Sequence, residues 1–483
     1  MRVLENLEPT QVFYFFEEIC KIPHGSGNVG VISDYLKRFA EERNLEVYQD
    51  QIKNIVIIKE ASEGYEEEPA VIVQGHMDMV AVHKPELDID MTKDPLKLKV
   101  NGDKVYAEGT SLGGDDGIAV AYALAILDDE TIKHPRLEVV ITVDEETGME
   151  GAREIDLSML KGSRLLNLDS EEEGIFLTSC AGGARVDCKL PVSFTQMEGV
   201  EYELLLGGLA GGHSGVEIHK ERGNANKLLG RFLWRLYLEE INAGLISAQG
   251  GLADNAIPRE TKCSILVAMD QKEVFEATVH SFEQDVKAEL ATKDSGFCIS
   301  VKQSENTCKK AICNNDFAVV AAFLNSLPNG VQAMSADIEG LVETSLNLGI
   351  LKVNEDGVEA SFSVRSSIES SKKALIEKLM SVVVLAGGEA EVDGDYPGWS
   401  YRVNSPLRDK MIALYKEMYG NEPKVEAIHA GLECGLLAGK IRDLDCVSFG
   451  PNMSNIHTTE ETLSISSTKR VWQYLIALLE RKG

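Results

Sequence analysis

The sequence predicts an α/β fold: a mainly parallel sheet with helices on both faces, interrupted by an inserted α+β domain. Two observations predict the sheet. In the first 186 residues, short apolar runs rich in β-branched residues alternate with helical segments. These runs have no polar face, which is typical of parallel strands buried between layers of helices. A third observation predicts the insert, because the pattern changes after about residue 187 and returns only after about residue 404.

The first 186 residues contain two amphipathic helices, one buried helix and four strand-like runs. Apolar residues recur at three- and four-residue steps from Pro9 to Cys20 and from Val29 to Arg43, which predicts two helices. GIAVAYALAIL (117–127) is apolar on every side and predicts a buried helix. The strand-like runs are NIVIIK (54–59), AVIVQ (70–74), LEVVITV (137–143) and SRLLNLD (163–169).

Residues 187–403 are predicted to form the insert, as two halves related by the order of their elements. The first half has strand-like runs at 201–206, 260–268 and 297–302 and helical runs at 224–239 and 272–291. The second has helical runs at 316–327 and 370–386 and strand-like runs near 343–352, 357–365 and 388–393. A helix at 405–419 and a strand at 445–450 then resemble the first domain again. We therefore expect residues 1–186 and 404–483 to form one domain.

The composition excludes several classes of function. With 48 basic and 78 acidic residues the formal charge is −30, and such a surface repels nucleic acids and anionic membranes. No run reaches eighteen apolar residues, and the first twenty residues lack a basic segment followed by an apolar core, so we expect neither a membrane span nor a signal peptide. The nine cysteines lack paired metal-site spacing and are expected to be buried free thiols. A cytoplasmic protein is predicted.

Residues capable of acid–base and metal chemistry follow the strand-like runs. GHMDMV (75–80), which contains His76 and Asp78, comes directly after AVIVQ. DEETG (144–148), which contains Glu145 and Glu146, comes directly after LEVVITV, and Asp169 closes SRLLNLD. Open parallel sheets bind ligands at the carboxyl ends of their strands. We therefore expect these imidazole and carboxylate groups to face one crevice.

Each pair has a functional and a plain interpretation. In an extended chain His76 and Asp78 point to the same side, so Asp78 could orient a metal-binding His76; the alternative is an ordinary surface loop. Adjacent glutamates can divide the work, with Glu146 binding a metal and Glu145 taking a proton. Their alternative is a solvated acidic face.

Two further candidates lie elsewhere in the chain. TSLGGDDGI (111–119) is a loop of small residues that presents Asp115 and Asp116 before the buried helix. Asp116 could simply cap that helix, and this does not exclude a ligand role for Asp115. His457 lies in a loop after the last strand-like run, where a single histidine often has no special role.

Together these positions give five metal-ligand candidates: His76, Asp115, Glu146, Asp169 and His457. Imidazole with carboxylate suits zinc, with cobalt or manganese as alternatives. Five protein ligands exceed the three of a typical catalytic zinc but fit two ions that share one bridging carboxylate. The sequence therefore predicts two divalent metal ions per subunit.

The order HxD, GGDD, DEExG, strand-closing aspartate and C-terminal histidine resembles the di-zinc peptidase superfamily that includes aminoacylase, peptidase T and carboxypeptidase G. Longer segments are similar to the bacterial aminoacyl-histidine (Xaa-His) dipeptidases over nearly the whole chain. They are SLGGDDGIAVA, NLDSEEEG, SCAGG, GGHSGVEIHKERGNANKLL and IHAGLECG. The chain departs from these relatives at Gly114, Asp115 and Asp116, where they often carry Ala-Asp-Asn.

The resemblance implies a zinc-peptidase-like catalytic domain and a role for each metal-site candidate. Asp115 would bridge two metal ions. His76 and Asp169 would complete one site, and Glu146 and His457 the other. Asp78 would orient His76, and Glu145 would act as the general base on a water activated by the two metals.

The resemblance also implies that the insert is a lid that contacts the substrate. His213, in GGHSG, would polarise the scissile carbonyl, and Arg365, in SFSVRSS, would bind the substrate carboxylate. Asn255 and Glu433 are further candidates, the latter for the substrate's amino group. Whether the protein is a homodimer, and whether His213 acts within its own chain, stays open.

The function implied is metal-dependent hydrolysis of dipeptides of the Xaa-His type, with a small peptide as the binding partner. Two alternatives remain. The first is an N-acyl amino acid amidohydrolase of the same superfamily. The second is a metal-binding protein without catalysis, which would not need the additional glutamate, Glu145, beside the ligands.

Overall fold

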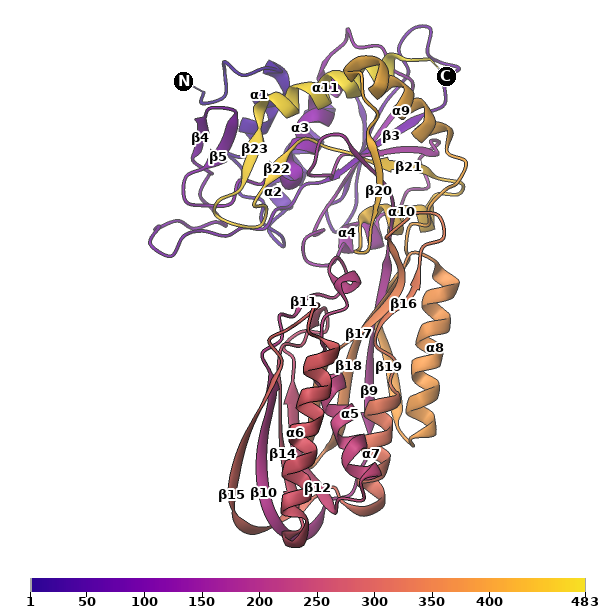
Figure 1. The fold of residues 1–483 in the computed structure, drawn as a ribbon. Helices are drawn as coiled ribbons and strands as arrows, with labels where there is room; N and C mark the ends of the chain where they lie inside the picture. Colours follow the sequence, from indigo (N-terminus) through magenta and orange to yellow (C-terminus); the bar gives the residue numbers. More distant parts are fainter. Residues whose placement is uncertain (1, 483) are drawn as a thin grey trace. The chain divides into compact units, whose positions relative to one another are not determined.

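The computed structural model describes residues 2–482, apart from the side chains of residues 305 and 306. Two compact units divide the chain (Figure 1). The first holds the chain up to Ser179, Tyr401–Ala427 and the chain from Leu432 onward; the second holds Cys180–Ser400 and Ile428–Gly431. The second unit thus begins before residue 187, which lies inside its first strand, β9 (Gly182–Leu190).

The first unit is built on a sheet of eight strands in the order β1-β2-β6-β3-β7-β21-β8-β20. Strands β6, β3, β7 and β21 pair in parallel, whereas β1–β2, β2–β6 and β21–β8 pair antiparallel. The bounds are β1 (Glu46–Gln49), β2 (Ile55–Lys59), β3 (Val71–His76), β6 (Leu137–Thr142), β7 (Arg164–Asn167), β8 (Ile175–Cys180), β20 (Lys424–Ile428) and β21 (Asp445–Ser448). Every residue of β2, β3 and β6 is buried. The predicted fold class, a mainly parallel sheet under helices, is confirmed.

One long helix of this unit, α3 (Gly114–Asp128), is buried. Its sequence offers no polar face, and from Gly114 to Leu127 every residue is buried. It packs on β3 and on α1. The other helices are α1 (Thr10–Ile19), α2 (Gly30–Glu42), α4 (Glu150–Glu154), α9 (Pro406–Tyr419), α10 (Glu433–Lys440) and α11 (Ile465–Glu480). The apolar faces of α1, α2, α3, α9 and α11 form a hydrophobic core with the sheet.

A small four-stranded sheet, in the order β22-β23-β5-β4, was not predicted from the sequence. Its strands are too short to show a periodic pattern: β4 (Leu98–Asn101), β5 (Lys104–Ala107), β22 (Met453–Ser454) and β23 (Thr462–Ser464). Strands β22 and β23 pair with each other. They therefore bracket the loop that carries His457.

The second unit is one antiparallel sheet whose strands follow the order β15-β10-β14-β12-β17-β18-β9-β19, with β16 paired to β17. Figure 1 shows helices α5, α6, α7 and α8 along this sheet. Besides β9, the strands are β10 (Thr195–Gly207), β12 (Ala243–Gly250), β14 (Thr261–Val267), β15 (Cys298–Ala311), β16 (Gly330–Met334), β17 (Val342–Asn354), β18 (Gly357–Ser366) and β19 (Glu389–Tyr396). The α-helices are α5 (Ala225–Leu238), α6 (Lys272–Glu289), α7 (Asn314–Ser326) and α8 (Glu369–Leu385). A two-stranded ribbon of β11 (Gly212–His213) and β13 (Ala256–Ile257), and the short 3-10 turns η1 (Ile218–Lys220) and η2 (Met269–Gln271), complete the unit.

The sheet order repeats within this unit. Strands β10, β12, β14 and β15, with α5 and α6, follow the order strand–helix–strand–strand–helix–strand. Strands β9, β17, β18 and β19, with α7 and α8, follow the same order. In both sets the fourth strand pairs with the first, the first with the third and the third with the second. The two sets join through β12 and β17, and the first is inserted between β9 and α7 of the second.

None of the nine cysteines, all within the described residues, forms a disulfide, as expected. The prediction that they are buried is wrong for Cys298 and Cys308, which are exposed in β15, a strand at the edge of its sheet. Among residues 2–482, no helix has both the length and the apolar character needed to cross a membrane.

The burial of α3 gives a testable consequence for stability. Leu124 is fully buried in α3, so Leu124→Ala should lower the free energy of unfolding by about 2–5 kcal/mol through the cavity it leaves. Urea unfolding followed by circular dichroism measures the change. Val31→Ala, at a position 63% exposed on α2, is the control and should change the value by less than about 0.5 kcal/mol. Equal shifts for the two variants would contradict the packing described here.

Candidate metal centre

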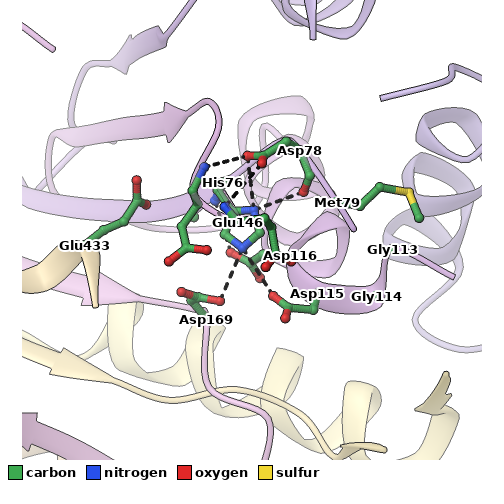
Figure 2. Close-up of polar contacts among 12 residues, drawn as sticks. His76, Asp78, Met79, Gly113, Gly114, Asp115, Asp116, Glu146, Asp169 and Glu433 are labelled. Atoms are coloured by element: carbon green, nitrogen blue, oxygen red, sulfur yellow. Dashed lines mark hydrogen bonds and ion pairs between the residues drawn. The ribbon is translucent and has the colours of Figure 1, made fainter. Parts of the chain in front are cut away.

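Three neighbouring parallel strands carry the first set of candidate residues to one edge of the sheet. His76 is the last residue of β3, which lies between β6 and β7 and pairs in parallel with both. Asp78 follows it, Glu145 and Glu146 follow β6, and Asp169 follows β7. Figure 2 shows His76, Glu146 and Asp169 turned toward one another at this edge.

Asp115 lies between two histidines. Its Oδ1 atom is 3.2 Å from Nε2 of His76, and its Oδ2 atom is 3.2 Å from Nε2 of His457. Nε2 of His76 is also 3.6 Å from an oxygen of Asp169, and Nε2 of His457 is 3.0 Å from an oxygen of Glu146. The five side chains therefore form two groups, each with one imidazole, and both groups share the carboxylate of Asp115.

These distances fit bound metal ions. Ligand nitrogen and oxygen atoms at about 2.0–2.1 Å from a tetrahedral zinc are about 3.3 Å apart, close to the separations of 3.0 to 3.6 Å found here. In addition, Oε1 of Glu146 is buried and has no hydrogen-bond partner in the described chain. The ligand atoms of Asp115, Glu146 and His457 all lie within 4.8 Å of one another. The donor set thus fits a divalent cation at each imidazole.

The electrostatics of the cluster also call for positive charge. Hydrogen bonds to Asp115 and Glu146 raise the pKa of His457 to about 10. Burial alone would lower the pKa of His76, but its contacts with Asp115, Asp169 and Asp78 raise it well above the usual range. Carboxylates that hold protons on two imidazoles this firmly would stabilise metal ions at the same points.

Asp78 contacts more than the histidine it was predicted to orient. Nδ1 of His76 is 3.0 Å from the backbone carbonyl of Asp78 and 3.5 Å from its carboxylate. The carboxylate accepts hydrogen bonds from Ser26 Oγ at 2.8 Å and from the backbone N–H groups of Glu145, at 3.1 Å, and Glu146, at 3.4 Å. Asp78 therefore fixes the backbone that carries both glutamates as well as the imidazole.

Glu145 occupies an environment that favours its protonated form. Glu145 is half-buried. Burial raises the pKa of Glu145 well above its usual value. His76, the next largest effect, lowers this pKa, and the nearby carboxylates of Asp169, Glu433 and Glu146 raise it. A carboxylate with a raised pKa can accept a proton and hold it, which is what a general base must do.

The sequence interpretation of Asp116 as a helix cap is wrong. Gly113 is the N-cap residue of α3, and no side chain caps this end. Instead, Oδ2 of Asp116 accepts a hydrogen bond from the backbone N–H of His76 at 3.2 Å, and its Oδ1 is buried with no partner among the described residues. Asp116 also belongs to a group of possible ligands with His76 and Asp169. Gly75 allows this close approach, because a Cβ there would lie 2.4 Å from Oδ2 of Asp116.

Two buried glutamates border the cluster. Glu433, a predicted substrate contact, is fully buried. Its Oε2 accepts hydrogen bonds from Gln74 and Thr142, its Oε1 has no partner in the described chain, and burial raises its pKa to about 7. Glu461 was not singled out by the sequence. It lies four residues after His457 and accepts hydrogen bonds from the Asp115 loop.

The second unit brings together a different set of predicted residues. His213 and Asn255 line one cavity of about 820 Å³. Nδ1 of His213 accepts hydrogen bonds from the backbone N–H groups of Gly215 and Val216, both at 3.2 Å, so the ring proton is assigned to Nε2. Burial, followed by the nearby Arg365, lowers the pKa of His213. His213 is therefore a neutral histidine, and its Nε2–H group has no acceptor among the residues that the structure describes.

Arg365 is a buried cation that pairs with no carboxylate of the described residues. Its Nη1 donates to the hydroxyl of Tyr396 at 3.3 Å, and its Nε has no hydrogen-bond partner in the described part of the chain. It lies directly across from Ser345 in the β17–β18 pair. Ser345 in turn hydrogen-bonds Nε2 of His429 at 2.7 Å, a buried histidine that the sequence analysis missed. Burial and Arg365 lower the pKa of His429 to about 3, so a neutral histidine accompanies the unpaired guanidinium.

Comparison with known proteins identifies relatives over nearly the whole chain. A model of peptidase family M20/M25/M40 matches residues 72–481. The cytosol non-specific dipeptidase of Escherichia coli (strain K12) is 39% identical over 482 residues, which covers 99% of each chain. The crystal structure of aminoacylhistidine dipeptidase from Vibrio alginolyticus is 36% identical, with a TM-score of 0.94 over 99% of this chain and 98% of that one. Aminopeptidase PepT from Bacillus cereus ATCC 10987, 15% identical with a TM-score of 0.56 over 98% of each chain, shares the fold.

The two adjacent aspartates should differ in their effect on metal binding. Asp115→Asn removes the charged group between the two imidazoles and should reduce the bound metal to fewer than two ions per chain. Asp116→Asn should retain two, because burial raises the pKa of Asp116 well above its usual range and an amide oxygen can still accept from His76. Elemental analysis after dialysis measures both variants. Metal loss in Asp116→Asn but not in Asp115→Asn would reverse the assignment of the bridge.

Proposed function

Because the chain belongs to peptidase family M20/M25/M40, we propose that it is a metal-dependent dipeptidase. The observation that carries the proposal is the position of Asp115, with one carboxylate oxygen 3.2 Å from each of the two imidazoles of His76 and His457. Beside this pair of sites lies Glu145, whose surroundings favour proton uptake. Cation sites next to a proton acceptor are the requirements of metal-assisted hydrolysis.

We assign two divalent metal ions to each chain, zinc being the metal that this donor set favours. His76, Asp169 and Asp115 would hold one ion, and Asp115, Glu146 and His457 the other. When bound, such ions polarise a peptide carbonyl and lower the pKa of a water molecule toward neutrality.

Residues of the chain then accept the proton and return it. Glu145 accepts a proton from the attacking water and returns it to the nitrogen of the leaving amine. Asp78 keeps Glu145 in place through the hydrogen bond from its backbone N–H.

The second unit supplies the groups that recognise the substrate. Nε2–H of His213 is a free donor for the oxyanion that forms at the scissile carbonyl. The unpaired guanidinium of Arg365 suits a C-terminal carboxylate, which it can bind through two parallel hydrogen bonds. Asn255, exposed beside His213 in the same cavity, is a further contact. In the first unit, the unpartnered Oε1 of Glu433 suits the substrate's ammonium group.

The names of the relatives support the substrate class. The Escherichia coli protein is a non-specific dipeptidase and the Vibrio alginolyticus protein an aminoacylhistidine dipeptidase. We propose that this chain accepts dipeptides, Xaa-His among them, and acts in the cytoplasm. A preference for C-terminal histidine is tested by comparing kcat/KM for Xaa-His dipeptides with that for Xaa-Ala dipeptides. Hydrolysis of a dipeptide but not of its N-acetylated analogue would exclude the amidohydrolase alternative.

The general-base role predicts that Glu145→Gln keeps its metal and loses its turnover. The amide cannot take a proton, so kcat should fall by at least about 10²-fold, as expected for a lost general base. Metal content by elemental analysis should stay at the wild-type value. Glu150→Gln, at an exposed position in α4, is the matched control and should keep full activity. Full activity in Glu145→Gln would refute the general-base assignment.

The carboxylate-binding role of Arg365 predicts a loss that depends on the substrate. Arg365→Ala should lower kcat/KM strongly for dipeptides with a free C-terminal carboxylate and much less for the corresponding amides. Arg185→Ala, in the neighbouring strand β9 and partly exposed, should affect neither. Equal losses on the free acid and the amide would show that Arg365 acts on the fold rather than on the carboxylate.

A further inference from the structure

Glu461 is a buried carboxylate that accepts hydrogen bonds from backbone N–H groups of the Asp115 loop. Its Oε2 accepts from Leu112 at 2.7 Å and Gly113 at 3.1 Å. Its Oε1 accepts from Gly114 at 2.8 Å and from Asp115 itself at 3.4 Å. The residue is only 3% exposed. Four consecutive amides therefore point at one carboxylate, and the last of them belongs to the proposed metal bridge.

The glycines of this loop make the arrangement possible. Gly113 adopts a left-handed conformation, with φ of 68°, and a Cβ there would lie 2.7 Å from the sulfur of Met79. A Cβ on Gly114 would lie 3.2 Å from Oε1 of Glu461. A left-handed residue followed by a helical one turns successive N–H groups toward a common point, forming a concave anion site. Here the chain fills that site with its own side chain.

The same residue also anchors the loop of His457. The backbone N–H of Glu461 donates to the carbonyl of Thr458 at 3.3 Å, and strand β23 begins at the next residue, Thr462. Glu461 thus joins two loops that are far apart in the sequence. One loop carries Asp115 and the other carries His457. Oδ2 of Asp115 lies 3.2 Å from Nε2 of His457.

We propose that Glu461 is a positioning residue that fixes Asp115 and His457 relative to each other and thereby sets the affinity for the metal ion held by Asp115, Glu146 and His457. The inference rests on the proposed two-metal site. Residues that orient metal ligands commonly contribute about 10–100-fold to metal affinity. The ion held by His76 and Asp169 should depend on Glu461 less, because only Asp115 is shared between the two sites.

The variant Glu461→Gln tests the proposal. Its NH₂ group would face two of the four backbone N–H groups, so those hydrogen bonds would be replaced by contacts between donors. Titration of the metal-free protein with Co²⁺ against a competing chelator, followed by the visible absorption of bound Co²⁺, measures each dissociation constant. We expect one of the two ions to bind about 10–100-fold more weakly and the other to change far less. KM should stay near wild type, and kcat should be restored by excess metal.

Glu138→Gln is a matched control for the loss of a buried, amide-bound carboxylate. Glu138 is fully buried at the opposite end of β6 and accepts hydrogen bonds from the backbone N–H groups of Lys161 and Gly162. This variant should lower the melting temperature of the metal-free protein while leaving both metal affinities unchanged. Weaker binding of a metal ion in both variants would mean that general destabilisation, not positioning, sets the metal affinity.

The possible outcomes separate this inference from the proposed function. A wild-type protein that binds no metal would overturn the proposed function, and the inference with it. Wild-type binding of two ions with unchanged affinities in Glu461→Gln would overturn the inference alone. If Glu461→Gln does not fold, Glu461→Asp carries the test: it keeps the charge but is one methylene too short to reach all four amides, so it should weaken the same ion by a smaller factor.

Discussion

The constraint on which the first unit depends is the repulsion among carboxylates gathered at one edge of its sheet. Asp78, Asp115, Asp116, Glu145, Glu146, Asp169, Glu433 and Glu461 all lie at or next to the cluster. Burial of an unpaired charge is costly, so such groups must bind a proton, an N–H donor or a cation. Different carboxylates of the cluster use different solutions of these three. Asp78 and Glu461 accept backbone N–H groups, Asp116 and Glu145 have pKa values raised toward the neutral form, and Asp115 faces two imidazoles.

The second unit has the opposite charge imbalance, a buried positive charge. Arg365 is buried and pairs with no carboxylate within residues 2–482, and the histidines beside it have lowered pKa values and are neutral. A substrate carboxylate would supply the negative charge that Arg365 lacks among the described residues. The antiparallel sheet suits the proposed contact because β17 and β18 hold Ser345 and Arg365 in fixed register, so the guanidinium would be positioned before a substrate arrives. Preorganisation of this kind reduces the entropy lost on binding.

The sequence revealed those parts of the site that depend on local order. His76, Glu146 and Asp169 could be found because polar residues at strand ends stand out against buried apolar runs. Glu461 could not, since its partners lie almost 350 positions away and HTTEE reads as a solvated acidic turn. The cap interpretation of Asp116 was wrong because its carboxylate bonds a neighbouring strand rather than its own helix. Strand β12, AGLISAQG, escaped detection because its small residues show no clear alternation.

The loop of His457 shows why local rules fail where metal ligands converge. His457 has a φ of 61° and Asn455 a φ of 55°, a left-handed conformation that costs residues other than glycine of order 1 kcal/mol each. Such a conformation persists only where surrounding contacts fix it. Here β22 and β23 pair on either side of the loop, Thr458 Oγ1 donates to the carbonyl of Asn455 at 2.7 Å, and Glu461 ties the loop to the Asp115 segment. The imidazole is therefore aimed at Asp115 and Glu146 by the backbone, and a bound metal ion would gain affinity from a geometry that the fold has already imposed.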